Sequence, residues 1–388
     1  MPQFEPFHAL RYSQKVSLQD VCAPPYDVQT DSDRKANADR SEHNIVHLDM
    51  PQGEEPYINA AKNLSTWIES RVLKLDDEPS FTLYRMKFID SAGRPRETVG
   101  VIGALKIEEP NSKQVLPHEQ TTPKAKTDRL ELTRTTRANL SPIWGLSLTE
   151  KLTAALIQPG EMLGELTDEN GVQHIVERVT NRARCGVISK LVAQQPVVIA
   201  DGHHRYAVSR TYRDETTTIK GAESILCYIN ELVDEQLSVA AIHRLYSDVE
   251  ITALVNQLTK YFEISELRNI DASIISKMAA QQHLTLVSRD GTAKIMKPKP
   301  DMFTGVRNLD SAMLEHALSA LELNVAYQHG YREIVEQLAT AKFIAAVLIR
   351  PVSVSEIQRT ASEGLLMPPK STFFTPKLQT GLVIRNLN

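Results

Sequence analysis

Cysteine is scarce in this sequence, and long apolar runs are absent. The chain of 388 residues has three cysteines, Cys22, Cys185 and Cys227, and none of them forms a Cys-x-x-Cys pair. An odd number of isolated cysteines excludes a disulfide framework and suits a reducing compartment. No apolar stretch approaches the roughly 20 residues that cross a membrane, and the start shows no signal peptide. We therefore expect a cytoplasmic protein with no membrane partner.

Charge of one sign is not concentrated anywhere in the chain. The 44 basic and 48 acidic residues are spread along it and give a net charge of −4. This excludes a basic stripe for nucleic acid, so a small molecule is the expected partner, while the oligomeric state stays open. The sequence also lacks a Walker P-loop, a Gly-x-Gly-x-x-Gly turn and a kinase His-Arg-Asp motif. Any nucleotide must therefore bind through a different element.

The sequence does contain a mixture of helix and strand patterns. Apolar residues recur at helical spacing over 57–71, and residues 81–88 and 98–107 alternate as paired strands do. Buried strands are expected at 197–200 and 343–349, where apolar residues are nearly continuous. Because helices and strands mix without strict alternation, the pattern favours an α+β fold, with mixed sheets and flanking helices, over a doubly wound sheet.

The predicted organisation has three parts. Residues 1–148 form an N-terminal α+β part, 176–265 a middle region and 266–388 a C-terminal α+β part, with a variable hairpin or loop at 149–175. Candidate site residues occur in all three parts. If they share one cleft, the first and last parts must fold over the middle region, so that the C-terminal part closes the same site.

The stretch from Val197 to Tyr206, VVIADGHHRY, joins an apolar strand to a turn of unusual chemistry. The strand stops at Asp201-Gly202, and a helix follows at once. The first N–H groups of a helix have no partner within it, and the helix dipole places partial positive charge there. Gly202 lets a ligand approach the backbone closely, and Arg205 can fork onto a phosphate or carboxylate. The turn is therefore a predicted anion site.

The side chains at this turn have alternative roles. Asp201 could cap the helix, hold Mg²⁺ or accept a proton. His203 and His204 project about 100° apart on a helix, so they do not easily ligate one metal together. One of them can face the ligand, with His204 a candidate catalytic group, while the other braces the turn. In the structural alternative, Asp201 is an N-cap, Arg205 is an ion-pair partner and the histidines are incidental.

The element resembles one that is found in the ParB/sulfiredoxin-like superfamily. There a strand, a Gly–(Cys or His)–His–Arg sequence and a helix hold nucleotide phosphates, and the free serine kinases come closest to the Asp-Gly-His-His-Arg spelling. The resemblance implies phosphate contacts by the four residues from Gly202 to Arg205. Sulfiredoxin requires a cysteine where this chain has His203, so its redox chemistry is not expected. The basic segments and helix-turn-helix of ParB-type DNA-binding proteins are also missing.

Over nearly its full length, the chain resembles a large bacterial and archaeal family known as domain of unknown function 1015. The resemblance rests on seven separated motifs that occur in the same order. They are Phe7–Arg11, Pro24–Val28, Asn44–Leu48, His118-Glu119 with Thr121 and Arg129, Ile199–Tyr206, His243-Arg244 and Met367–Leu378. It implies family membership and assigns no reaction.

A second candidate constellation begins at His118 and Glu119. A carboxylate in a closed site can take the proton of a hydroxyl while cations neutralise a transferring phosphoryl group. Glu119 is the candidate general base, and His118 is a candidate substrate contact. Lys124, Lys126 or Arg129 could supply the positive charge. The alternative is a solvated polar loop, and the family resemblance favours the functional interpretation.

The N-terminal segment offers three further candidates for substrate binding. Its Pro-Pro-Tyr-Asp loop is stiff and presents Tyr26 and Asp27. These side chains could wall a pocket, and equally Asp27 could cap the next helix. Arg11 is either an anchor for a substrate carboxylate or part of a surface ion pair.

Two later cations complete the predicted site. Arg244 ends a strand and is a candidate phosphate contact. Lys370 lies in Met367–Lys377, a segment with three prolines, two lysines and three hydroxyl side chains before a terminal strand at 381–384. A segment that ends in an apolar strand is expected to dock rather than fray, so Lys370 could close an anionic site. A plain surface turn is the alternative.

These features favour a phosphate- or nucleotide-binding enzyme. The leading hypothesis is a small-molecule kinase that uses ATP or ADP and acts on a serine-like hydroxyl metabolite. The phosphates would lie on the turn after Asp201, with Mg²⁺ near its carboxylate. Glu119 would deprotonate the acceptor, and Lys370 and Arg244 would neutralise charge. Two alternatives stay open: a nucleotide-binding regulatory protein without phosphotransfer, and a hydrolase or lyase that acts on a phosphorylated metabolite.

Overall fold

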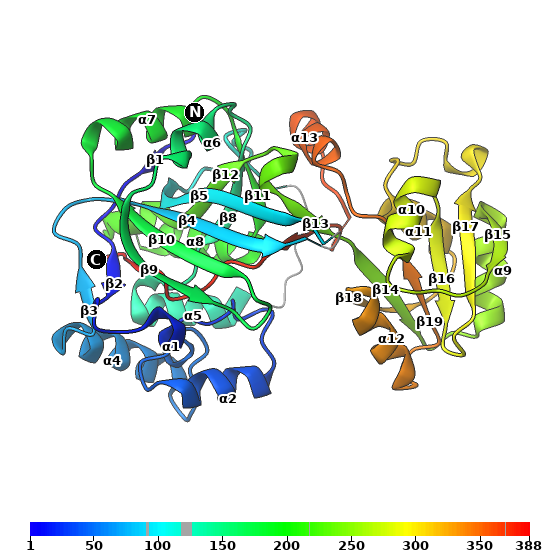
Figure 1. Cartoon of the computed structure of the whole chain (residues 1–388), viewed down its shortest axis with the longest axis horizontal. Helices are drawn as coiled ribbons and strands as arrows, with labels where there is room; N and C mark the ends of the chain where they lie inside the picture. The colour runs from blue at the N-terminus through cyan, green and yellow to red at the C-terminus, as the bar shows by residue number, and fades with distance from the viewer. Residues whose placement is uncertain (91–92, 118–125, 217, 369) are drawn as a thin grey trace. The chain divides into compact units, whose positions relative to one another are not determined.

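The computed structural model describes residues 1–388 except 91–92, 118–125, 217 and 369 (Figure 1). The chain divides into two compact units. Unit 1 comprises Met1–Ser238, Ala361–Leu365 and Pro376–Asn388, and unit 2 comprises Val239–Thr360 and Leu366–Thr375.

This division differs from the predicted three parts. The predicted boundary at 265/266 falls inside strand β15 (Phe262–Leu267). The predicted N-terminal and middle parts contribute strands to one sheet, so they belong to a single unit.

Unit 1 contains eight helices and most of the strands that the structure describes. Its helices are α1 (Leu18–Val21), α2 (Asp31–Arg40), α3 (Val46–Asp49), α4 (Pro56–Glu69), α5 (Lys126–Thr136), α6 (Leu152–Ile157), α7 (Arg182–Val192) and α8 (His203–Glu215), with short 3₁₀ turns at Lys220–Glu223 and Asp234–Gln236. Its strands are β1 (Phe4–Glu5), β2 (Leu10–Tyr12), β3 (Leu73–Leu75), β4 (Phe81–Ile89), β5 (Pro95–Lys106), β6 (Val115–Pro117), β7 (Ala138–Asn139), β8 (Ile143–Ser147), β9 (Glu161–Thr167), β10 (Gln173–Val179), β11 (Val197–Asp201), β12 (Ser224–Glu231) and β21 (Arg385–Asn386).

The main sheet of unit 1 is mixed. Its strand order is β6-β11-β8-β12-β5-β4-β10-β9, and β1 pairs with β5 outside this path. Strand β11 runs parallel to β6 and antiparallel to β8, and β12 runs parallel to β8. The predicted strand pair at 81–88 and 98–107 is confirmed as the antiparallel pair β4 and β5. The prediction of an α+β fold is also confirmed.

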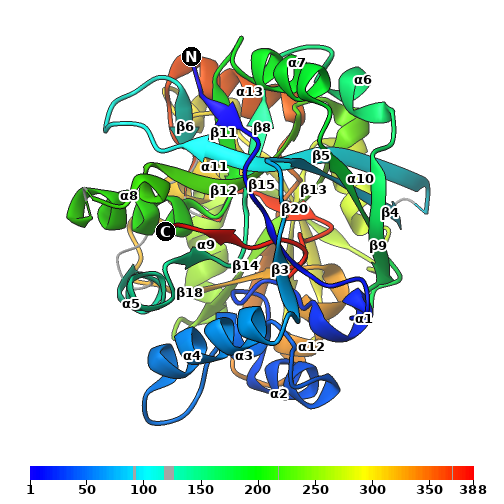
Figure 2. The ribbon, with the colours of Figure 1, turned by 90° about the vertical axis from the view of Figure 1, so that its left-hand side faces the viewer.

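The core of unit 1 explains why β11 has an apolar sequence. Helices α6 and α7 cover one face of the sheet, while α4 and α5 lie on the other side (Figures 1 and 2). Val197 and Ile199 pack with residues of α6 and α7 in one buried cluster. Val198 and Ala200, which alternate with them along the strand, are buried as well. Strand β11 is therefore covered on both faces up to the residue before the turn.

The C-terminal segment Pro376–Asn388 is part of unit 1 (red in Figure 2). Single β-bridges join Thr380 to Ala23 and Ile384 to Leu10. Strand β21 then pairs with β7. The expectation that this segment docks is met, although the regular strand lies at β21 rather than at the predicted 381–384.

Unit 2 is a smaller α+β body. Its helices are α9 (Ile251–Tyr261), α10 (Ile274–Gln281), α11 (Asp310–Leu318) and α12 (Tyr331–Ala339), with a 3₁₀ turn at Pro300–Phe303. Its strands are β14 (Ile242–Ser247), β15 (Phe262–Leu267), β16 (Leu284–Ser288), β17 (Ala293–Pro298), β18 (Asn324–His329), β19 (Ala345–Leu348) and β20 (Phe373–Thr375). Two elements, β13 (Ser238–Ala240) and α13 (Val354–Glu363), begin in one unit and end in the other.

Six strands of unit 2 form an antiparallel sheet in the order β15-β17-β16-β19-β14-β18. Helices α9 and α11 pack on one face of this sheet, and α10 and α12 pack on the other, each pair with its own buried cluster. Leu254 and Leu258 of α9 and Ile334 and Leu338 of α12 recur at helical spacing and are buried against the sheet. Among the helices that the structure describes, none is both long and apolar enough to cross a membrane.

Tight packing of the main sheet generates a stability prediction. A Cβ atom on Gly100 in β5 would lie 2.3 Å from Cζ of the fully buried Tyr228. Gly100→Ala should therefore lower the free energy of unfolding by about 1–3 kcal/mol through overpacking. The control is Gly186→Ala in α7, where a Cβ atom meets nothing within 4 Å, and it should raise that free energy by about 1 kcal/mol. Urea denaturation measures both, and equal effects would contradict the packing.

Candidate functional site

The candidate site is built around the turn between β11 and α8. The pairing of β11 with β8 shifts register between Ile199 and Asp201, so a β-bulge precedes the turn. A bulge re-aims the side chain that follows it. Gly202 then adopts a φ of +85°, where a Cβ atom would also lie 2.9 Å from Cγ2 of Ile143. Both the dihedral angle and the space therefore require glycine.

Helix α8 begins directly at this glycine. Gly202 is its N-cap, and no side chain caps the helix. The first hydrogen bond of the helix ladder runs from the Tyr206 N–H to the Gly202 carbonyl, 2.9 Å. The N–H groups of residues 203–205 precede that ladder and lie at the positive end of the helix dipole. The side chains of His203 and His204 are half-buried beside them.

Asp201 forms two ion pairs at the start of the turn. Its Oδ2 accepts from Nη2 of Arg205 at 3.1 Å, and its Oδ1 lies 3.5 Å from Nζ of Lys377. Burial alone would raise the pKa of Asp201, but Lys377, Arg205 and His203 outweigh it and hold that pKa well below its usual range. Asp201 is therefore an anion in the folded protein and holds two cations beside the turn.

The guanidinium of Arg205 is bound within the protein. Its Nη1 donates to the Pro142 carbonyl, and its Nη2 donates to Asp201. Burial lowers the pKa of Arg205, but Asp201, Asp27 and Tyr26 raise it above the ordinary value. Two of its five N–H donors thus have partners within the protein, as in the ion-pair alternative, and its role as a phosphate contact stays a prediction.

A second group of residues lies within electrostatic range of Arg205. The guanidinium of Arg129 lies 4.3 Å above the ring of Tyr26, and its Nη1 donates to Oδ1 of Asp49 at 3.2 Å. Tyr26, Asp27 and Asp49 each interact electrostatically with Arg205. Burial raises the pKa of the Asp49 carboxyl, and Arg129 and Arg205 partly offset the effect. Tyr26 and Asp27 therefore lie within electrostatic range of Arg205, and Arg129 lines the same cavity as Arg205, while their role in substrate binding stays a prediction.

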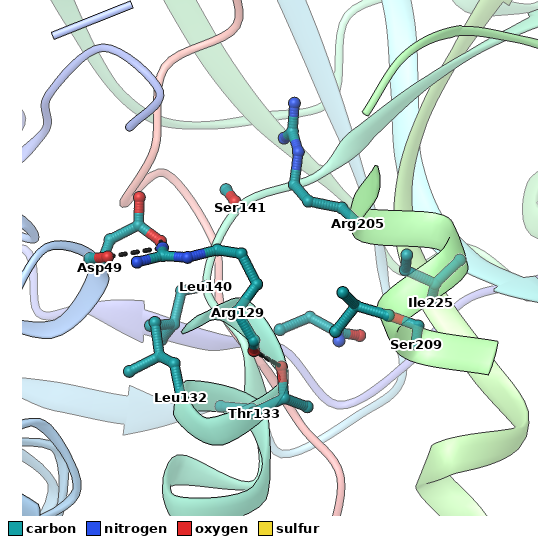
Figure 3. A pocket seen from close by; sticks show the side chains of 12 residues that line it. Asp49, Arg129, Leu132, Thr133, Leu140, Ser141, Arg205, Ser209 and Ile225 are labelled. Carbon is teal, nitrogen blue, oxygen red and sulfur yellow. Dashed lines mark hydrogen bonds and ion pairs between the residues drawn. The ribbon is translucent and has the colours of Figure 1, made fainter. Parts of the chain in front are cut away.

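Between these two groups lies a small cavity (Figure 3). It has a volume of about 40 Å³ and is lined by residues that include Asp49, Arg129, Arg205 and Ser209. In Figure 3, Arg129 reaches toward Asp49, while Arg205 projects from the first turn of α8. A water molecule occupies about 30 Å³ in the liquid, so the cavity accommodates solvent and not a nucleotide.

Other predicted site residues lie elsewhere or outside the described residues. Arg11 is 7% exposed and bonds to Asp76, Ser80 and Thr82, all within 3.2 Å. Arg11 therefore forms an ion pair that is buried and not on the surface, as its alternative interpretation had placed it, and its role as a substrate anchor stays a prediction. His118 and Glu119, together with Lys124, lie outside the described residues.

Arg244 and Lys370 are in unit 2, and they are neighbours there. Nη1 of Arg244 donates to the Lys370 carbonyl at 3.0 Å. The adjacent His243 accepts from the Ile349 N–H at 3.2 Å. Burial, with Arg244 and His329, lowers the pKa of His243 to about 3, so this imidazole is neutral in the folded protein. The phosphate-binding role of Arg244 and Lys370 stays a prediction.

Two residues of the cluster, Lys377 and Asp49, were not predicted from the sequence. Lys377 reaches Asp201, whereas the sequence favoured Lys370 from the same segment. Asp49 directly follows the Asn44–Leu48 motif, and that motif was the available signal for it. The motif ends one residue before Asp49, so an extension of the motif by one position would have included it.

A buried chain of hydrogen bonds anchors the segment that carries Lys377. The Gln379 N–H donates to the Tyr84 hydroxyl at 3.1 Å, and that hydroxyl lies 2.7 Å from Nδ1 of His174. Nε2 of His174 lies 3.2 Å from Oδ2 of Asp168. With Nε2 protonated, every group in the chain has a matching donor or acceptor. These hydrogen bonds fix the backbone at Gln379, two residues beyond Lys377.

Mg²⁺ does not fit Asp201 in this arrangement. Both carboxylate oxygens already pair with cations, and Mg²⁺ prefers carboxylates that are open to it in octahedral geometry. Within the described part of the chain, no group of three or more His, Cys, Asp or Glu side chains could hold a metal ion. No step proposed below passes through a metal at Asp201.

The fold and this turn define an α+β protein in which helix α8 begins at a glycine with a positive φ. The family model described as "Protein of unknown function (DUF1015)" matches residues 4–312. This match covers most of the chain, so the chain belongs to that family. No curated protein matches the chain. The similarity to ParB/sulfiredoxin-like proteins stays a prediction.

Several solved structures are similar to this chain at low identity. A conserved hypothetical protein from Pyrococcus furiosus is 14% identical with a TM-score of 0.38, over 68% of this chain and 87% of that chain. A free serine kinase in complex with AMP has the same identity and TM-score, over 69% and 89%. SbnI from Staphylococcus aureus with a C-terminal truncation is 12% identical with a TM-score of 0.40, over 72% and 85%. These TM-scores are too low to carry an activity over to this chain.

The anchor of Lys377 can be tested with two tyrosines of the same sheet. Tyr84→Phe removes the hydroxyl that accepts from Gln379, so the Lys377 segment should loosen by about 1 kcal/mol. The rate at which acetic anhydride acetylates Lys377, measured by mass spectrometry, should rise about fivefold. Tyr228→Phe is the matched control, because the buried Tyr228 hydroxyl has no hydrogen-bond partner among the described residues. Equal labelling of Lys377 in both variants would contradict the anchor.

Proposed function

We propose that unit 1 binds the phosphate groups of a nucleotide at the turn between β11 and α8. We further propose that the protein is a small-molecule kinase acting on a hydroxyl metabolite. The observation that carries the proposal is the uncapped start of α8 at Gly202, with its φ of +85° and a pair of cations beside it. A helix N-terminus that is preceded by glycine suits phosphate because its N–H groups point at the ligand.

The charges near the turn support an anionic ligand. Asp201 contributes one negative charge and is paired with both Arg205 and Lys377. The local sum of these three side chains is thus positive, and the helix dipole adds to it. His203 and His204 can donate further hydrogen bonds to phosphate oxygens. A phosphate would therefore be attracted to the turn without displacing Asp201 from its partners.

The proposed reaction is transfer of one phosphoryl group. The acceptor hydroxyl oxygen forms a bond to the terminal phosphorus of the nucleotide, and the bond from that phosphorus to the bridging oxygen breaks. Glu119 takes the hydroxyl proton, and the electron pair of the broken bond stays on the departing nucleotide. Cations at the turn stabilise the charge that spreads over the phosphoryl oxygens. The role of Glu119 rests on the sequence alone.

A binding experiment tests the phosphate site. Calorimetry with ATP, ADP and pyrophosphate, each with and without Mg²⁺, should show saturable binding to the wild-type protein. Lys377→Met should weaken binding about tenfold, because it removes a cation and leaves Asp201 less neutralised. Lys190→Met is the control, since Lys190 is exposed on α7, across the sheet. No binding of any of the three ligands would refute the proposed site.

Turnover distinguishes the kinase from its alternatives. With nucleotide and a panel of hydroxyl metabolites, a kinase forms a phosphorylated acceptor, and Glu119→Gln should abolish that product while nucleotide binding is kept. Nucleotide binding without a phosphorylated product would indicate a regulatory protein. Pyrophosphate or phosphate binding without any effect of the nucleoside would indicate a hydrolase or lyase of a phosphorylated metabolite.

A further inference from the structure

Unit 2 contains a cavity that the proposed phosphate site at the turn of unit 1 does not use. It has a volume of about 220 Å³ and lies among α11, β14, β18 and the loop between α11 and β18. One wall is aliphatic and consists of Leu314, Leu318, Leu321, Leu323 and Val325. The remaining lining is polar and includes Arg244 and Glu315. The cavity is therefore amphipathic, with an aliphatic wall and a polar part that includes both of its charged side chains.

Arg244, one of the two charged residues that line the cavity, is buried and held in a fixed orientation. It is 4% exposed, and its guanidinium lies 4.9 Å from the centre of the Tyr327 ring. Its Nη1 donates to the carbonyls of Ile242 and Lys370, which hold the guanidinium in place. A guanidinium in a fixed plane suits a carboxylate better than a mobile ammonium does. The polar part of the cavity is thus prepared for a carboxylate.

Glu315 supplies the opposite charge close to Arg244. Burial raises the pKa of the Glu315 carboxyl, and Arg244 partly offsets that rise, so the two charges that line the cavity interact electrostatically. A simple carboxylic acid that entered the cavity would be repelled by Glu315. A ligand with an ammonium group next to its carboxylate would satisfy both side chains at once. An α-amino acid has that arrangement on a single carbon atom.

The volume of the cavity limits the side chain of the ligand. A cavity of about 150 Å³ lined by aliphatic residues holds one benzene molecule. The cavity in unit 2 is larger by about the volume of two water molecules at 30 Å³ each. This is room for a branched aliphatic or aromatic side chain and the two charged groups. A small polar side chain would leave the leucine wall in contact with water.

We propose that this cavity binds an apolar α-amino acid. Arg244 holds the carboxylate, Glu315 holds the ammonium group, and the aliphatic wall receives the side chain. The proposal concerns unit 2 alone and does not depend on phosphate binding at the turn in unit 1. Failure of either proposal therefore leaves the other standing.

Three ligands of one shape test the proposal on the full-length protein. L-leucine carries both charged groups, 4-methylpentanoate lacks the ammonium group, and 3-methylbutylamine lacks the carboxylate. Calorimetry and saturation-transfer NMR should show saturable binding of L-leucine, with each analogue at least about tenfold weaker, because either Glu315 or the buried Arg244 then lacks its partner on the ligand. L-serine should also bind at least about tenfold more weakly, because it leaves the aliphatic wall uncovered.

The Glu315→Gln variant distinguishes binding at this cavity from nonspecific binding of amino acids. The variant should bind L-leucine about tenfold more weakly than the wild-type protein does, with an affinity close to that for 4-methylpentanoate. Glu336→Gln is the matched control on α12, on the opposite face of the sheet, and should change neither affinity. The proposal is overturned if L-leucine and L-phenylalanine show no saturable binding. It is equally overturned if Glu315→Gln leaves the ratio of leucine to 4-methylpentanoate affinity unchanged.

Discussion

The carboxylate of Asp201 joins strand β11 and the helix that follows it to the C-terminal segment, which lies far away in the sequence. It ends strand β11, pairs with Arg205 in the first turn of α8, and pairs with Lys377 in the C-terminal segment. A buried ion pair of this kind costs solvation energy, so its geometry must be set by the surrounding structure. The bulge before Asp201, the left-handed Gly202 and the Tyr84–Gln379 hydrogen bond provide that geometry. The shape of the turn and the arrangement of its charges therefore depend on the same set of contacts.

The elements that the sequence predicted well are those with strong periodicity or unusual local chemistry. The strand at 197–200 is apolar because both faces are covered, and Asp-Gly after it marks the turn. Helix α5 was not predicted, because its residues are mostly polar and show no apolar stripe. Residues 238–247 form two strands, β13 and β14, and the continuous apolar residues from Val239 to Ile242 give no sign of the break between them. The division into units passes through this same stretch.

For the site, sequence reasoning found the residue types but could not assign all their partners. Tyr26, Asp27 and Arg129 lie near Arg205, as expected. Lys377 rather than Lys370 pairs with Asp201 because Gln379 bonds to Tyr84, which lies 295 residues earlier in the chain. No local pattern encodes such a contact. Arg11 had the right chemistry for a ligand, yet Asp76 already neutralises it.

The central claim is that phosphate groups lie on the first N–H groups of α8. Labelling with ¹⁵N-histidine tests it directly, because the 11 histidines give a simple amide spectrum and two of them occupy the turn. During titration with ATP, the amide signals of His203 and His204, assigned through single His→Gln variants, should shift most and reach saturation together. If these two signals stay in place while ATP binds, the turn is not the phosphate site.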